Sequence, residues 1–193
     1  METKGDAIER AAKIRLIIFD VDGVLTDGGI YMGENGELFK PFNCRDGLGI
    51  TLAHRSGLKT AIITGRTSKQ LANRAAELHI TEVMQGQMNK RNAYKELKAK
   101  YGLRDEEMAY LGDDLIDLPI MLQVGLPGAV ADARPEVSEA ALFVSDMSGG
   151  RGAAREFIEF ILKAQGKWQG AIENFYQIEC DENTAAPVSS MGQ

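Results

Sequence analysis

The chain has 193 residues, of which 44% are hydrophobic and 26% are charged, a composition that is ordinary for a globular protein. Its net charge is −6 and its lysines and arginines form no run, which argues against nucleic-acid binding. The apolar runs are far shorter than the ~20 residues that span a bilayer, and the first residues carry no signal-peptide pattern. We therefore expect no membrane association and a cytoplasmic location. Cys44 and Cys180 form neither a disulfide framework nor a zinc motif.

The first predicted strand ends in two acidic residues. Leu16 to Phe19 is an apolar run that suits a buried strand, and Asp20 and Asp22 follow it, with Gly23 allowing a turn. Carboxylates at the carboxyl end of a buried strand lie where open α/β sheets place their chemistry. Two acids this close repel each other unless a cation lies between them, and Mg²⁺ prefers oxygen ligands. A carboxylate in this place can also act as a nucleophile.

This motif has two other interpretations. Asp20 and Asp22 could simply form a turn after a strand. Asp-x-Asp-Gly also begins the EF-hand loop, but Val24 and Tyr31 stand where that loop needs an acidic or Asn side chain and a Glu. The EF-hand interpretation is therefore excluded.

A β-hairpin is predicted next in the chain. Residues 28–32 and 38–42 flank the segment 33–37, which contains Asn35 and Gly36, and Asn-Gly is the strongest short hairpin signal. We expect residues 28–42 to form a small flap.

The rest of the chain alternates between strands and helices. Strands are predicted at 14–20, 58–63, 82–85, 108–112, 128–131 and 142–145. This alternation predicts a doubly wound, mostly parallel α/β sheet of the Rossmann-like type. Residues 1–176 are expected to form one domain, and the small, polar residues 177–193 a flexible tail.

Polar side chains follow three of the later strands. Thr64 follows the second long strand, Lys90 lies just inside a helix, and Asp113 follows the strand at 108–112. A phosphate ester needs a nucleophile in line with phosphorus and donors on its oxygens. Asp20 could attack, Asp22 could protonate the leaving alcohol and activate water, Thr64 and Lys90 could bind the phosphoryl group, and Asp113 could complete a Mg²⁺ site.

These motifs resemble those of the haloacid dehalogenase superfamily of phosphotransferases. The match spans roughly residues 14–166 and rests on Asp20-Val-Asp-Gly-Val, Thr64, Lys90 and Gly112-Asp-Asp. The resemblance implies that Asp20 is the nucleophile and Asp22 the general acid/base. It implies that Asp20, the backbone carbonyl of Asp22 and Asp113 hold Mg²⁺, and that Thr64 and Lys90 hold the phosphoryl group. Asp114 and Asp117 are weaker candidates, and Asp117 is either a surface residue or a partner of Lys90.

Many members of this superfamily carry a cap domain over the site, and this chain has no room for one. Only 43 residues separate Asp20 from Thr64, and 25 separate Thr64 from Lys90. An isolated hairpin is marginally stable in water, so we expect residues 28–42 to pack against a neighbouring subunit. The alternative is a hairpin that lies on its own domain.

Within the superfamily, the chain is similar to the 3-deoxy-D-manno-octulosonate 8-phosphate phosphatases. The matching segments are Asp20-Val-Asp-Gly-Val-Leu-Thr-Asp-Gly, Arg45-Asp-Gly-Leu-Gly-Ile, Ile63-Thr-Gly-Arg, Gln85-Gly-Gln, Gly112-Asp-Asp-Leu-Ile-Asp, Ala129-Val-Ala-Asp-Ala and Gly149-Gly-Arg-Gly. This resemblance implies a capless homotetramer whose hairpins help to build neighbouring sites. It also implies a phosphatase in the synthesis of the sugar acid of the lipopolysaccharide inner core.

Such a substrate carries a carboxylate, and an arginine fork can bond both of its oxygens. Arg66, Arg74 and Arg151 are the candidates. Arg66 ranks first because it follows Thr64 closely, while Arg151 is either a binding residue in a Gly-rich turn or a surface residue. The segment 168–193 is longer than is usual in this group, so the resemblance leaves the role of the tail open.

Three competing functions remain on the sequence alone. The substrate could be a nine-carbon sugar acid phosphate of the sialic-acid type. The domain could be a phosphoacceptor signalling module, although Asp22 argues against this, or a non-catalytic interaction module, although every catalytic position is filled.

Overall fold

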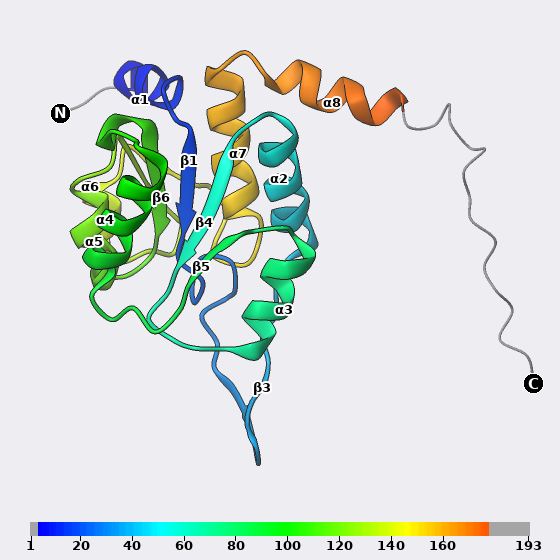
Figure 1. The fold of residues 1–193 in the computed structure, drawn as a ribbon, viewed down its shortest axis with the longest axis vertical. Coiled ribbons are helices and arrows are strands. Elements are labelled where there is room, and N and C mark those ends of the chain that lie inside the picture. The colour runs from blue at the N-terminus through cyan, green and yellow to red at the C-terminus, as the bar shows by residue number, and fades with distance from the viewer. Residues whose placement is uncertain (1–3, 178–193) are drawn as a thin grey trace, which may run out of the picture.

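A computed structural model of the protein describes residues 4–177. Its centre is a parallel sheet of six strands in the order β5-β4-β1-β6-β7-β8, and Figure 1 shows helices on both faces of this sheet. The strands are β1 (Leu16–Phe19), β4 (Lys59–Ile63), β5 (Glu82–Met84), β6 (Met108–Gly112), β7 (Leu126–Ala129) and β8 (Phe143–Val144). The predicted doubly wound α/β fold is confirmed.

The helices divide between the two faces of the sheet, as the two apolar clusters of the core show. One cluster packs α2 (Cys44–Arg55), α3 (Lys69–Glu77) and α7 (Ala153–Ala164) on the sheet. The other packs α4 (Lys90–Tyr101), α5 (Leu118–Met121) and α6 (Pro135–Ala140). In Figure 1, α1 (Lys4–Ala11) and α8 (Trp168–Gln177) lie at the end of the molecule opposite the hairpin. Two short 3₁₀ turns, η1 (Asp105–Glu107) and η2 (Leu115–Asp117), flank β6.

Strand β1 lies in the middle of the sheet and is buried on both faces. Leu16 and Ile18 belong to one apolar cluster, and Ile17 and Phe19 belong to the other. Successive side chains of a strand point to opposite faces, so an unbroken apolar run is what a doubly covered strand requires. Burying each such side chain is worth ~1.5–3 kcal/mol, so the residues that follow β1 start from a firmly held backbone.

One strand begins earlier than its sequence indicates. The strand predicted at 128–131 is observed as β7 at Leu126–Ala129, so it includes Pro127. A proline lacks the amide that a central strand normally uses. Strand β8 pairs only with Gly128 and Ala129 of β7. Pro127 precedes this paired segment, so no ladder hydrogen bond to β8 needs the amide hydrogen that proline lacks.

The hairpin is present but shorter than predicted. Its strands are β2 (Tyr31–Gly33) and β3 (Gly36–Phe39), and Gly33 pairs with Gly36, so the turn contains only Glu34 and Asn35. Gly36 has a φ of 104°, a value that glycine adopts without strain. In Figure 1 the hairpin extends away from the body of the molecule.

No cap domain is inserted in the described chain at either point where the superfamily places one. The hairpin, α2 and β4 fill the interval between the first two motifs, and α3 and β5 fill the next interval. The tail predicted at 177–193 lies outside the described residues, apart from Gln177 at the end of α8. No helix in the described part of the chain is both long and apolar enough to cross a bilayer.

Candidate active site

The carboxyl ends of β1 and β6 bring the first and last motifs together. These two strands are neighbours, with Phe19 paired to Leu111, so Asp20 and Asp113 leave the sheet side by side. Carboxylate oxygens of Asp20, Asp113 and Asp117 all lie within 4.8 Å of one another. Gly23 makes this approach possible, because a Cβ at this position would lie 2.1 Å from Oδ2 of Asp113.

Lys90 supplies a buried positive charge to this group of acids. Its side chain is fully buried at the start of α4, and its Nζ lies 2.7 Å from Oδ1 of Asp20 and 2.6 Å from Oδ1 of Asp117. The hydroxyl of Tyr110 lies 3.1 Å from the same nitrogen. The side chain of Asn89 caps the helix by accepting a hydrogen bond from the backbone amide of Arg91.

Asp117 is the partner of Lys90 rather than a surface residue, which decides between the two interpretations of its sequence. It is completely buried. Its Oδ1 accepts hydrogen bonds from Lys90 and from the Tyr110 hydroxyl at 2.6 Å. Its Oδ2 accepts from the backbone amides of Asp113 at 2.9 Å and Asp114 at 3.2 Å. Both oxygens are occupied, so this side chain orients its neighbours and has little capacity left for a metal.

The electrostatics of the site are those of acids held together in a buried space. Burial raises the pKa of Asp20 to about 6, with Lys90 lowering it and Asp117 raising it. Burial raises the pKa of Asp113 to about 8, and the charges of Asp20, Asp117 and Asp114 add to the effect. A divalent cation would relieve this repulsion. The available donors are all oxygens, which fits Mg²⁺.

The second motif lies at the same edge of the sheet. Thr64 directly follows β4, a neighbour of β1, and its side chain is buried. Arg66 is more exposed, at 43% of its side-chain surface, and its Nε lies 3.8 Å from Oδ2 of Asp22. The structure therefore places Arg66 at the rim of the site, as its position two residues after Thr64 indicates.

The two other candidate arginines lie in different surroundings. Arg151 is exposed, in a loop that packs on the loop after β1, where the amide of Gly150 donates to the carbonyl of Val24 at 2.9 Å. Arg74 instead forms an ion pair with Glu77 at 2.8 Å, and a Cβ at Gly47 in α2 would lie 2.2 Å from its guanidinium.

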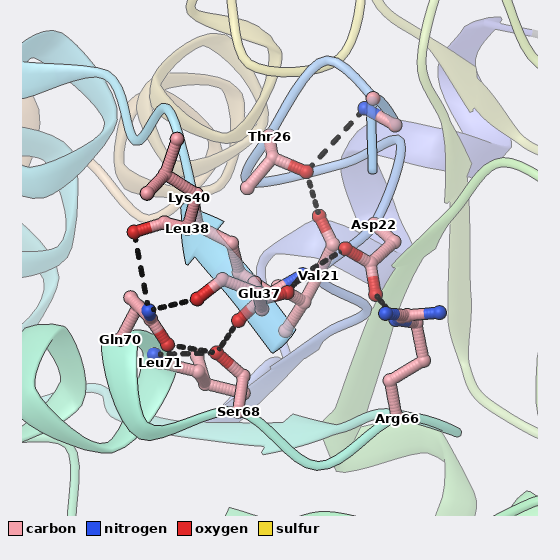
Figure 2. A network of polar contacts seen from close by, with 12 residues as sticks. Val21, Asp22, Thr26, Glu37, Leu38, Lys40, Arg66, Ser68, Gln70 and Leu71 are labelled. Atoms are coloured by element: carbon pink, nitrogen blue, oxygen red, sulfur yellow. Dashed lines mark hydrogen bonds and ion pairs between the residues drawn. The ribbon is translucent and has the colours of Figure 1, made fainter. Parts of the chain in front are cut away.

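A polar network that the sequence does not predict lies at the base of the hairpin (Figure 2). Lys40, directly after β3, contacts Asp22, and Glu37 of β3 contacts Lys40 and the hydroxyl of Ser68. Burial raises the pKa of Glu37, but the hydrogen bonds from Ser68 and Lys40 and the charges of Lys40 and Arg66 outweigh it and hold this pKa below its usual value. A lysine and a glutamate in a short hairpin normally indicate a solvent-exposed surface, so the sequence offered no signal for this network.

With this geometry in place, comparisons with known proteins decide the family. Residues 63–157 match the model of the haloacid dehalogenase-like hydrolases. The 3-deoxy-D-manno-octulosonate 8-phosphate phosphatase of Yersinia pestis is 54% identical over 86% of this chain and 89% of its own length. That of Escherichia coli K12 is 53% identical over 84% of this chain and 86% of its own length. The chain belongs to the haloacid dehalogenase-like hydrolases.

Solved structures of this family agree with the fold. The crystal structure of the Yersinia pestis phosphatase has a TM-score of 0.84, covering 86% of this chain and 89% of that one. The 3-deoxy-D-manno-octulosonate 8-phosphate phosphatase of Moraxella catarrhalis, solved with magnesium, phosphate and the sugar acid, is 37% identical with a TM-score of 0.86. It covers 89% of this chain and 98% of that one. The four sequence motifs that indicated a haloacid dehalogenase-like hydrolase thus lie together at one edge of the sheet.

Proposed function

We propose that this protein is a Mg²⁺-dependent phosphatase that hydrolyses 3-deoxy-D-manno-octulosonate 8-phosphate to the free sugar acid and phosphate. One observation carries the proposal. Asp20 is buried, with the ammonium of Lys90 at 2.7 Å and a carboxylate oxygen of Asp113 within 4.8 Å, in a chain 54% identical to a phosphatase of this substrate. A nucleophilic carboxylate, a cation and a metal-binding acid in one place are what phosphoryl transfer requires.

The residues divide the reaction into two steps. In the first, a carboxylate oxygen of Asp20 attacks phosphorus, the bond from phosphorus to the ester oxygen breaks, and Asp22 donates its proton to that departing oxygen. In the second, Asp22 takes a proton from water, the water oxygen attacks phosphorus, and the bond to Asp20 breaks, releasing phosphate. Thr64 and Lys90 bind the phosphoryl oxygens through both steps.

The metal would be held by Asp20, Asp113 and the backbone carbonyl of Asp22. The crowded, all-oxygen donor set and the raised pKa values of the two carboxyls support this assignment. Magnesium at this place supplies positive charge to the phosphoryl oxygens as negative charge develops on them. Asp117 is left out of the ligand set because four hydrogen bonds already occupy its oxygens.

The sugar carboxylate would be bound by arginine at the rim of the site. Arg66 is the first candidate, because it is exposed and lies beside Asp22. Arg151 is the second, because its loop packs on the loop that follows β1.

The assembly we propose is a homotetramer in which hairpins cover neighbouring sites. The hairpin extends from the body (Figure 1), and its exposed apolar side chains are those of Ile30, Met32, Leu38 and Phe39. Several exposed apolar side chains on one small element normally mark a contact with another protein. With no cap domain in the described chain, a neighbouring subunit is the part that would exclude water. We also propose that the enzyme acts in the cytoplasm, as expected from its sequence, and that it acts in synthesis of the lipopolysaccharide inner core, as its resemblance to the 3-deoxy-D-manno-octulosonate 8-phosphate phosphatases implies.

The proposal is tested by phosphate release from sugar acid phosphates with eight and nine carbons. The wild-type protein should prefer the eight-carbon substrate and lose its activity in EDTA. Asp20→Asn should abolish turnover, because an amide cannot attack phosphorus. Full activity in EDTA, or turnover by Asp20→Asn, would contradict the chemistry, and a preference for nine carbons would contradict the substrate.

A further inference from the structure

Lys40 places a buried ammonium between two carboxylates at the base of the hairpin (Figure 2). Only 3% of its side chain is exposed. Its Nζ contacts Oδ1 of Asp22 and lies 3.2 Å from Oε1 of Glu37. A lysine beside a surface hairpin normally keeps its charged end in water, and burying that charge is costly unless it is paired. Both partners are therefore needed to hold it there.

The contact with Lys40 fixes the side chain of Asp22 from one side. Asp22 is 19% exposed, and its second oxygen has a cation only at 3.8 Å, the Nε of Arg66. Lys40 is thus the closer of the two cations. Without it, the carboxyl of Asp22 would have no close side-chain partner to select its rotamer.

Glu37 connects this pair to the loop that follows Thr64. One of its oxygens accepts a hydrogen bond from the hydroxyl of Ser68, and its backbone carbonyl accepts one from the side chain of Gln70 at 2.9 Å. Ser68 itself caps α3 by accepting from the amide of Leu71 at 3.2 Å. The hairpin, Asp22 and the start of α3 are therefore held by one continuous set of polar contacts.

We propose that Lys40 is a positioning residue for proton transfer: held by Glu37 of the hairpin, it orients the carboxyl of Asp22 toward the leaving oxygen. This inference rests on the proposed function, because it takes Asp22 to be the proton donor. It adds that the donor is oriented by the hairpin of its own chain. Seating of the hairpin therefore determines whether the acid is in place.

Such a role predicts a dependence on the leaving group that a purely structural role would not produce. A poor leaving group such as phenolate needs a proton as its bond to phosphorus breaks, whereas 4-nitrophenolate leaves readily without one. Both aryl phosphates are similar in size and lack the sugar. The ratio of their kcat/KM values therefore reports how much proton donation by the general acid contributes to the first step. This quantity excludes the later hydrolysis step, in which Asp22 also acts.

The experiment compares Lys40→Met with the wild-type protein on phenyl phosphate and 4-nitrophenyl phosphate. A positioned acid contributes ~10²–10⁴-fold, so we expect kcat/KM to fall at least about ten-fold on phenyl phosphate and less than about two-fold on 4-nitrophenyl phosphate. Lys95→Met, which removes an exposed lysine of α4, is the matched control and should change neither value. Equal losses on both esters, or no loss on either, would overturn the proposal.

Two further variants keep the test decisive if Lys40→Met folds poorly. Glu37→Gln retains Lys40 but removes one of the two negative charges that pair with it. Its kcat/KM should also fall more on phenyl phosphate than on 4-nitrophenyl phosphate, by a smaller factor than in Lys40→Met. Adding Lys40→Met to Asp22→Asn should cause no further loss on phenyl phosphate, and a further ten-fold loss would overturn the proposal. No phosphate release by the wild-type protein from any ester would overturn the proposed function instead.

Discussion

The Nζ of Lys90 lies 2.7 Å from Oδ1 of Asp20, and both side chains are buried. This pair joins the first residue of α4 to the first residue after β1. The lysine is the nearest positive charge that can balance Asp20 and Asp117 inside the protein, so its removal should affect stability as well as catalysis.

Lys90→Met should destabilise the protein by about 3–5 kcal/mol, the usual cost of removing one partner from a buried ion pair. The methionine fills a similar volume but leaves two buried carboxylates without their cation. Urea unfolding measures the effect, with Lys95→Met as the surface control. Phosphate release should fall in parallel, since the phosphoryl group loses a donor. Unchanged unfolding would show that the acids do not depend on this lysine.

Replacing Met32 and Leu38 together by lysine should dissociate the assembly and lower activity. These residues are 62% and 64% exposed in the single chain, so the folding of one subunit does not depend on their side chains. Light scattering gives the mass, and phosphate release gives the activity. Leu122→Lys, at a residue of the body that is 73% exposed, is the control and should change neither. A fully active monomer of the wild-type protein, of about 21.1 kDa, would rule out this role for the hairpin.

Arg66→Ala should raise KM for the acid sugar phosphate far more than for 4-nitrophenyl phosphate. Losing hydrogen bonds to a charged group costs about 1.5–3 kcal/mol, and the aryl ester has no carboxylate to lose. Arg66→Lys should not restore the affinity, because an ammonium cannot form the two parallel bonds of a guanidinium. Equal losses on both substrates would place Arg66 at the phosphate. No loss on either would transfer the role to Arg151.

His54 should contribute less to stability as the pH falls. Burial lowers the pKa of this imidazole below its ordinary value of 6.5, and the charge of His79 lowers it further. A group with a lowered folded-state pKa contributes stability above its unfolded pKa and loses it as the pH falls through the folded value. The contribution of His54 to the free energy of unfolding should therefore decrease as the pH falls below about 6.5, whereas the raised pKa values of Asp20 and Asp113 act on the total stability in the opposite direction.

Urea unfolding across that range tests the assignment to His54. The difference in the free energy of unfolding between the wild-type protein and His54→Gln should change in favour of the variant as the pH falls, because the glutamine side chain carries no titrating group. His79→Asn is the matched control and should keep most of the pH-dependent contribution of His54, since burial is the larger cause of its lowered pKa. Asparagine suits the left-handed φ of 57° at that position. Identical slopes in the wild-type protein and His54→Gln would contradict the assignment.

The strand ends were predictable because a buried run followed by a polar residue marks the edge of a sheet. This pattern located Asp20, Thr64 and Asp113, whose strands turned out to be neighbours in the order β4-β1-β6. The sequence could not decide whether Asp117 is a surface residue or the partner of Lys90, because its burial depends on how η2 folds back under the amides of Asp113 and Asp114.

Lys40 could not be predicted as part of the site for a related reason. Its partner Asp22 lies 18 residues earlier in the chain, and the contact between Glu37 and Ser68 joins residues 31 apart. No local periodicity records contacts at such separations. A lysine at the end of a two-stranded hairpin therefore has the same sequence pattern whether it is solvated or buried.

Gly23 sets a limit on how this site can vary. A φ of 93° penalises any side chain there, and a Cβ would occupy the space of the Asp113 carboxylate. The loop after β1 and the acid after β6 are thus in direct contact, and main-chain geometry governs how closely they approach. In a saturation library of this loop, Gly23 should be among the positions that tolerate no replacement, even though it carries no reactive group.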